Sequence, residues 1–144
     1  MTLPLWTLLG FAAWTLIVLL AGVGVRRWAL ILRHQASLTS FPADTAHGSP
    51  AYRRAMRAHA NCVENLPVFA AIVLTASLAR LAPPLFGTLC VTTMIGRIGQ
   101  SSVHMLLPES NASIAVRFAF FLLQIVSMFA MMALVVAAAA AGTI

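Results

Sequence analysis

The chain has 144 residues, which is the length of one domain, and we treat residues 1–144 as a single unit. Hydrophobic residues make up 61% of it, whereas soluble globular chains contain about 45–50%. The formal net charge of +6 could suit nucleic acid, but only 8% of the residues are charged, and this composition excludes a nucleic-acid-binding domain. It predicts an integral membrane protein whose first partner is the lipid bilayer.

The first apolar run covers residues 3–25 and carries no charge, so a helix there would cross the roughly 30 Å hydrocarbon core. Trp6 and Trp28 stand at its two ends, as interfacial aromatic anchors do. A cleaved signal peptide is the alternative, but it would have a basic start and a shorter apolar core. No Lys or Arg precedes Arg26, so we expect a spanning helix.

A polar connection follows at residues 26–52, and three further apolar segments come after it. We expect these helices at residues 53–81, 85–107 and 113–141. Pro67 falls inside the second helix and predicts a kink there. Strands are not expected, because a lipid-exposed sheet edge leaves backbone groups unsatisfied. The fold class is therefore an all-α membrane protein, a bundle of four transmembrane helices.

The distribution of arginine predicts the orientation. Six of the nine arginines lie between Arg26 and Arg57, whereas the opposite connection offers only Arg80. Because cytoplasmic loops are enriched in basic residues, the loop at residues 26–52 should be cytoplasmic and both termini should lie on the outer side. A short chain of this kind suits a bacterial inner membrane.

Two helices carry a polar stripe at helical spacing. The second helix contributes Arg53, Arg57, Asn61 and Glu64, and the third contributes Arg97, Gln100, Ser101 and His104. Ionisable groups at membrane depth are costly unless paired, so we expect the two stripes to face each other. In two neighbouring antiparallel helices, each step forward along one helix matches a step back along the other, so residues at equal depth have numbers with a constant sum. One value of this sum pairs Glu64 with Arg97, Asn61 with Gln100, and Arg57 with His104.

We interpret Glu64 and Arg97 as a structural ion pair, because each offers the other charge neutrality. The shallower groups are candidate ligand contacts, because they lie nearer the cytoplasmic end, where a polar molecule could enter. They are Arg57, Asn61, Gln100 and His104. The alternative is that all of these groups only hold the helices together.

Arg117 stands at the start of the fourth helix. A guanidinium beside a helix N-terminus stabilises an anion, including a thiolate, so Arg117 is a candidate anion-binding residue. The alternative is a side chain that reaches out to lipid phosphate. No group of His, Cys and acidic residues has the spacing of metal ligands, so we expect no metal site.

Several small and sulfur-containing residues inside the helices are expected to pack against neighbouring helices. Cys62 and Cys90 fall in apolar segments and are expected to be packing residues rather than a disulfide. Gly96 and Gly99 flank the deep arginine and predict a close helix approach. The cluster of Met128, Met131 and Met132 is expected to fill space in the core.

The segment from Arg57 to Phe69 reads RAHANCVENLPVF, and it resembles the signature of the MAPEG family, the membrane-associated proteins of eicosanoid and glutathione metabolism. Gly96-Arg97 and the arginine that opens the fourth helix extend the resemblance over most of the chain, which looks like a bacterial-type member. The resemblance implies a homotrimer of four-helix protomers, with glutathione as co-substrate bound between subunits at the cytoplasmic side.

Residue by residue, the resemblance implies that Arg57, Asn61 and Glu64 contact glutathione, that Arg97 neutralises Glu64, and that Arg117 stabilises the thiolate. This sequence departs from the family pattern at several positions. Ala60 replaces a frequent arginine, Gln100 and His104 replace a common His and Tyr, and Phe118 and Phe121 replace hydroxyl residues.

The leading hypothesis is therefore a glutathione-dependent membrane transferase or peroxidase acting on small lipophilic electrophiles. The departures leave a second hypothesis open: a non-catalytic member of the same fold that binds lipid or a thiol ligand. A third is a small multidrug exporter, which would also have four helices and one membrane glutamate. Exporters of that kind carry the glutamate in the first helix, so Glu64 in the second counts against it.

Overall fold

The computed structural model describes residues 1–42, 47–81 and 83–143. Every regular element in these ranges is a helix. In chain order the elements are α1 (Leu3–Ile17), the π-helical segment η1 (Val18–Gly24), α2 (Val25–Leu32), the short 3-10 helix η2 (Leu38–Ser40), α3 (Pro50–Leu78), α4 (Pro84–Leu106) and α5 (Asn111–Ala140). Part of the expected 26–52 loop, residues 43–46, lies outside the described residues.

The first three elements form one continuous rod from Leu3 to Leu32, longer than the helix expected at residues 3–25. Arg26 and Arg27 therefore lie on a helix rather than in the loop. Arginine is a good helix former, and its long side chain can extend the charged end toward water. The helix therefore continues through Arg26 and Arg27. The wide π-helical turn brings Gly22 against α3, where a Cβ on the glycine would lie 3.1 Å from the Ala55 Cβ.

Local capping explains where α3 and α5 begin. The Ser49 side chain accepts a hydrogen bond from the Tyr52 N–H, and Pro50 occupies the first turn, so α3 starts at Pro50 rather than at the expected residue 53. Helix α5 starts at Asn111 rather than at 113, because Ser110 and Ser113 form a reciprocal capping box. Helix α3 runs through Pro67 without ending there.

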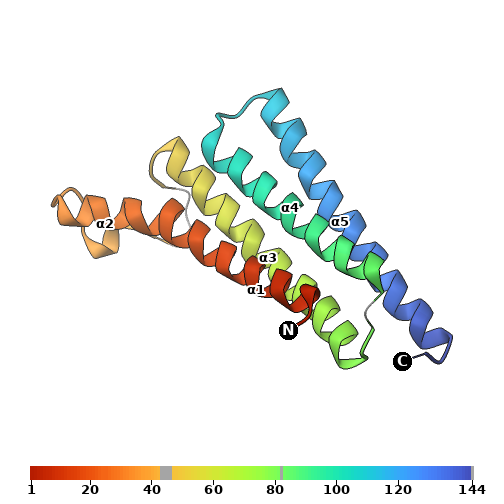
Figure 1. Ribbon diagram of the computed structural model, residues 1–144. Helices are drawn as coiled ribbons and strands as arrows, with labels where there is room; N and C mark the ends of the chain where they lie inside the picture. Colours follow the sequence, from red (N-terminus) through yellow and green to blue (C-terminus); the bar gives the residue numbers. More distant parts are fainter. Residues whose placement is uncertain (43–46, 82, 144) are drawn as a thin grey trace.

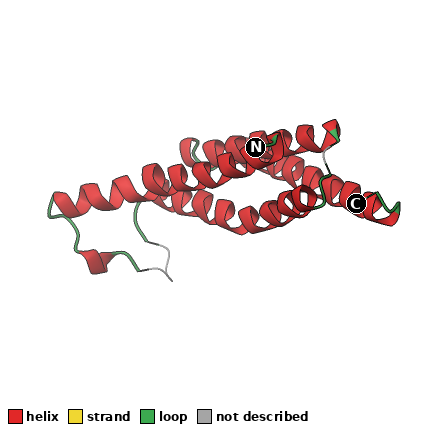
Figure 2. Cartoon of the chain, turned by 60° about the horizontal axis from the view of Figure 1, so that its bottom comes forward, coloured by secondary structure: helices red, strands yellow, loops and turns green. Residues whose placement is uncertain are grey.

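The long helices lie side by side, with their axes roughly along one direction (Figure 1). The two termini lie at one end of the bundle, together with the connection between α3 and α4. Helix α2 extends past the other end, and Figure 2 shows the chain folding back beneath it before it enters α3. Helix α4 is central, because it packs most extensively against α5 and also contacts α1 and α3.

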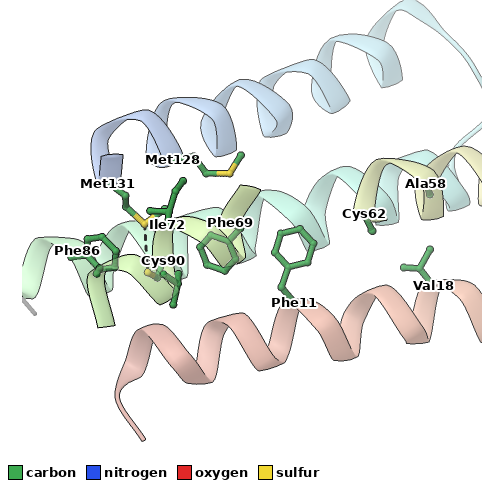
Figure 3. Packing of buried hydrophobic residues seen from close by; sticks show 12 residues of the cluster. Phe11, Val18, Ala58, Cys62, Phe69, Ile72, Phe86, Cys90, Met128 and Met131 are labelled. Carbon is green, nitrogen blue, oxygen red and sulfur yellow. Dashed lines mark hydrogen bonds between the residues drawn. The ribbon is translucent and has the colours of Figure 1, made fainter. Parts of the chain in front are cut away.

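The core is built from aromatic, aliphatic and sulfur-containing side chains (Figure 3). The Phe11 and Phe69 rings of α1 and α3 lie 5.6 Å apart, and the Cys90 and Met131 sulfurs of α4 and α5 lie 3.5 Å apart. Cys62 and Cys90 are both free and buried, which confirms that they are packing residues. Met128 and Met131 are also core residues, and Met132 packs against the core from its edge.

Each long helix exposes several large apolar side chains, as a lipid environment requires. In residues 1–42, 47–81 and 83–143, three helical segments are long and apolar enough to cross a membrane: Leu3–Leu32, Pro50–Leu78 and Asn111–Ala140. Helix α4 is not among them, because its buried polar residues lower its hydropathy. At 23 residues it nevertheless has a length of about 34 Å, calculated from the helical rise per residue.

The two glycines beside Arg97 hold α4 close to α5, as expected. A Cβ on Gly96 would lie 2.7 Å from the Gln124 Cγ and 3.0 Å from the Phe120 carbonyl oxygen, and one on Gly99 would lie 2.6 Å from the Phe120 ring. Bringing a side chain into this contact requires the two helices to separate.

We expect Gly96→Ala to lower the free energy of unfolding by about 1–3 kcal/mol, the usual cost of overpacking, as measured by denaturant titration in micelles. Gly10→Ala is the matched control, because its Cβ would only reach ordinary contact, 3.8 Å from the Met94 methyl carbon. That control should be neutral or gain up to about 1 kcal/mol, since alanine is the better helix former. Equal stability of the two variants would contradict a close α4–α5 contact.

Candidate functional site

The polar stripe of α3 faces away from the single chain. Arg53, Arg57 and Glu64 are exposed and Asn61 is half-buried. The face of α3 that packs inward is instead made of small and apolar residues: Tyr52, Ala55, Ala58, Cys62, Phe69, Ile72, Val73 and Ala76. The expectation that the stripes of the second and third helices face each other was therefore wrong within one chain. Alanines allow α1 and α4 to approach α3 closely, and this contact turns the charged side outward.

The polar stripe of α4 is buried, and its partners come from α1 and α5. Gln100 accepts a hydrogen bond from the Gln124 amide of α5 at 3.1 Å. Ser101 accepts one from the Trp14 indole N–H of α1 at 2.9 Å and donates to the Arg97 carbonyl oxygen. The groups expected to meet α3 thus hold α4 between its two other neighbours.

Arg97 is 0% exposed, and its three guanidinium nitrogens have no hydrogen-bond partner among the described residues. Its charge lies 5.4 Å from the centroid of the Phe11 ring and beside the Cys62 thiol. The expected Glu64–Arg97 ion pair is absent from the single chain, because Glu64 lies on the outward face of α3. Glu64 is still close enough to attract the guanidinium electrostatically.

Arg117 and His104 form the polar cluster at the α4–α5 turn. Arg117 Nη1 lies 2.5 Å from His104 Nδ1. A guanidinium cannot accept a hydrogen bond, so Nδ1 accepts and the ring proton sits on Nε2. The Nε2 atom is buried and has no partner in the described part of the chain. His104 therefore holds an unused N–H donor directly beside a half-buried cation.

The charges of Arg54 and Arg57 on α3 also act on the His104 ring. The equal-total pairing of Arg57 with His104 stays a prediction, because Arg57 is exposed on α3 whereas His104 is buried on α4. Arg57, His104 and Arg117 lie at the end of the bundle that carries the α4–α5 turn. They offer two positive charges and one N–H donor there. Such a set suits an anionic ligand.

Three residues of this region were missed by the sequence argument: Phe11, Trp14 and Thr15, all on α1. Trp14 fastens α1 to α4 through its indole, Phe11 covers Arg97, and Thr15 lies near the Cys62 thiol. A tryptophan in the middle of an apolar span was an available signal, because a buried indole N–H needs an acceptor.

Comparison with known proteins adds one positive result. The MAPEG family profile matches residues 3–137, which is nearly the whole chain. The chain belongs to the MAPEG family. No curated protein and no solved structure matches it significantly. MAPEG membership and the three long apolar helices together make it a membrane protein.

Proposed function

We propose that this MAPEG protein is a glutathione-dependent membrane transferase or peroxidase that acts on lipophilic electrophiles. In this proposal α4 crosses the membrane together with the three more apolar helical segments, which gives four crossings. The protein is a homotrimer in which a neighbouring subunit covers the outward face of α3. Following the arginine distribution, the end that carries Arg26, Arg27 and Arg57 faces the cytoplasm and both termini lie on the outer side. The membrane is the bacterial inner membrane.

One observation carries the proposal: within the described residues, the charged side chains of the α3 stripe, Arg53, Arg57 and Glu64, are exposed rather than packed against another helix. Glu64 and Arg57 are too polar to face acyl chains, so something other than lipid must cover them. A neighbouring copy would bring its own His104 and Arg117 toward this face and form an enclosed site. Family membership supports glutathione as the ligand of that site.

The available groups fit glutathione chemically. Arg57 would bind a carboxylate, and Asn61 and Gln100 would exchange hydrogen bonds with the peptide amides. The His104 Nε2–H would donate to a further carbonyl or carboxylate oxygen. Arg117 would lie near the sulfur, because a cation favours the reactive thiolate over the thiol.

A second function has specific support. Phe118 is exposed and Phe121 is half-buried on the same helix as Arg117, and neither offers a hydroxyl to a thiolate. A member that binds glutathione or lipid without turning it over would tolerate this change. Nothing in the helix arrangement or the family match supports the exporter hypothesis.

Native mass spectrometry of the purified protein in mild detergent tests assembly and ligand binding together. We expect a species of three times the 15.3 kDa chain mass that takes up glutathione and reaches three bound molecules at saturation. Millimolar glutathione should also raise the melting temperature, because a ligand that binds only the folded state stabilises it.

Oxidised glutathione with a blocked sulfur, and a tripeptide without the γ-glutamyl carboxylate, are the matched ligand controls. A monomer or dimer as the sole species would contradict the trimer. Binding without conjugation of a lipophilic aryl halide would favour the second function, and absence of both would remove glutathione from the proposal.

A further inference from the structure

The direction of the Arg117 side chain depends on its hydrogen bond to His104. A half-buried arginine near the end of a membrane helix can extend its charged end out to water or to lipid headgroups. In that position the cation would lie outside the bundle, away from a sulfur held in the proposed site. The guanidinium instead stays against α4, where its Nη1 lies 2.5 Å from the Nδ1 of His104, a residue that is only 6% exposed.

The helix that carries Arg117 offers the guanidinium no free side-chain acceptor among the described residues. The neighbours on its own helical face are three and four positions away: Ser113, Ile114, Phe120 and Phe121. Three of these side chains are apolar. The Ser113 hydroxyl is already engaged in the turn, where it accepts from the Ser110 N–H and hydroxyl and donates to the Pro108 carbonyl oxygen. The acceptor therefore has to come from α4, and it is His104.

Close packing of α4 against α5 sets the distance between the two side chains. Gly99 leaves room for the Phe120 ring, which a Cβ on this glycine would approach to 2.6 Å. His104 lies five residues further along α4, and Arg117 lies three residues earlier on the antiparallel α5, so the same close approach brings them together. The capping box at the start of α5 fixes the turn between them. The pair is thus built within one chain.

The two nitrogens of the His104 ring have different roles open to them. Nδ1 accepts from Arg117, which leaves the ring proton on Nε2. Nε2 is buried and has no hydrogen-bond partner among the described residues. In the proposed site this N–H would donate to an oxygen of glutathione. One imidazole would then contact the ligand with one nitrogen and the activating cation with the other.

We infer that His104 is the positioning residue of Arg117: its Nδ1 holds the guanidinium beside the glutathione sulfur, while its Nε2–H binds a glutathione oxygen. The inference rests on the proposed function and adds to it a role that is separate from ligand binding. With Nη1 engaged, the guanidinium keeps its other N–H groups for the thiolate. A cation fixed in advance also needs no reorganisation during the reaction. It acts at a position where Phe118 and Phe121 offer no hydroxyl.

Two amide variants separate the roles of the two nitrogens. Asparagine can place its oxygen at the level of Nδ1 but does not reach Nε2. His104→Asn should therefore keep turnover at saturating glutathione, while affinity falls about 2- to 10-fold for the loss of one hydrogen bond. Glutamine reaches Nε2 with its amide nitrogen, but its δ atom is a carbon and cannot accept. His104→Gln should therefore keep the affinity, while turnover slows roughly tenfold, as in Arg117→Ala.

The measurements are conjugation of a lipophilic aryl halide and, separately, glutathione affinity by native mass spectrometry. His34→Gln is the matched control, because this histidine is exposed just beyond α2, and both quantities should stay unchanged. The thiolate absorbance of bound glutathione should fall in His104→Gln as it does in Arg117→Ala. A change in helix packing alone would not produce this spectroscopic loss.

A double variant shows whether His104 acts through Arg117. His104→Gln should add little to the rate loss of Arg117→Ala, because the cation that it positions is already gone. Rate losses that multiply in the double variant would mean that the two residues act independently, and this would overturn the inference. Full turnover by His104→Gln would also overturn it.

The tautomer of His104 tests the inference without glutathione. Nitrogen NMR of protein labelled at histidine should show the proton on Nε2 for the signal that His104→Asn removes, and Arg117→Ala should shift the Nδ1 resonance. A proton on Nδ1 would overturn the inference alone, because glutathione could still bind. Absence of glutathione binding by the wild-type protein would remove the proposed function and this role with it, so the two failures differ.

Discussion

Replacing Arg117 by alanine is expected to slow glutathione conjugation by roughly tenfold or more while leaving glutathione affinity nearly unchanged, because the cation acts on the thiolate. The structure places this cation next to His104. The measurement is conjugation of a lipophilic aryl halide, with glutathione affinity measured separately by native mass spectrometry. The thiolate absorbance of the bound ligand should fall in the variant, which a purely structural role would not produce.

Arg57→Ala is the comparison variant, and it should have the opposite effect. A carboxylate of glutathione would lose a charge-assisted hydrogen bond worth about 1.5–3 kcal/mol, so affinity should fall by roughly 10- to 150-fold. Turnover at saturating glutathione should change much less. Arg33→Ala, an exposed arginine outside the cluster, should leave both quantities unchanged. If Arg117→Ala weakened binding as much as Arg57→Ala, the thiolate role would be wrong.

The second large effect concerns Arg97, whose buried charge has no hydrogen-bond partner within the described chain. We expect Glu64→Gln to lower the free energy of unfolding of the assembled protein by about 3–5 kcal/mol, because it removes the nearest compensating charge from a buried cation. Arg97→Met removes the charge and keeps most of the side-chain volume, so it should be far better tolerated. The measurement is denaturant titration of the purified protein in micelles.

The double variant Glu64→Gln/Arg97→Met distinguishes an electrostatic partnership from two independent effects. With Arg97 already replaced, Glu64→Gln should cost little, which gives a coupling free energy above about 1 kcal/mol. Glu109→Gln is the control for loss of an acid, since Glu109 is exposed at the α4–α5 turn. Strictly additive losses would show that Glu64 does not stabilise Arg97 even in the assembled protein.

The amino-acid sequence by itself determined the helical membrane class, the approximate extent of each long helix and the membership that the residues 57–69 suggested. These features are local. An uninterrupted apolar run can satisfy its backbone in lipid only as a helix, and the close approach at Gly96 follows from a missing side chain. Helix ends were less accurate, because capping by Ser49 and Ser110 acts over one turn and does not disturb the apolar pattern.

Only the tertiary structure decided which way each polar face points. Helical periodicity shows that Arg57 and Glu64 share a face with each other, and that Arg97 and His104 share another, but it does not say which neighbour each face meets. The small residues Ala55 and Ala58 are on the buried face of α3, and Ala55 lies against Gly22 of η1, because helices pack closest where the side chains are small. That choice turned Glu64 outward and left Arg97 buried without a hydrogen-bond partner among the residues that the structure describes. The unpaired charge is the physical reason to look for the rest of the site in a second subunit.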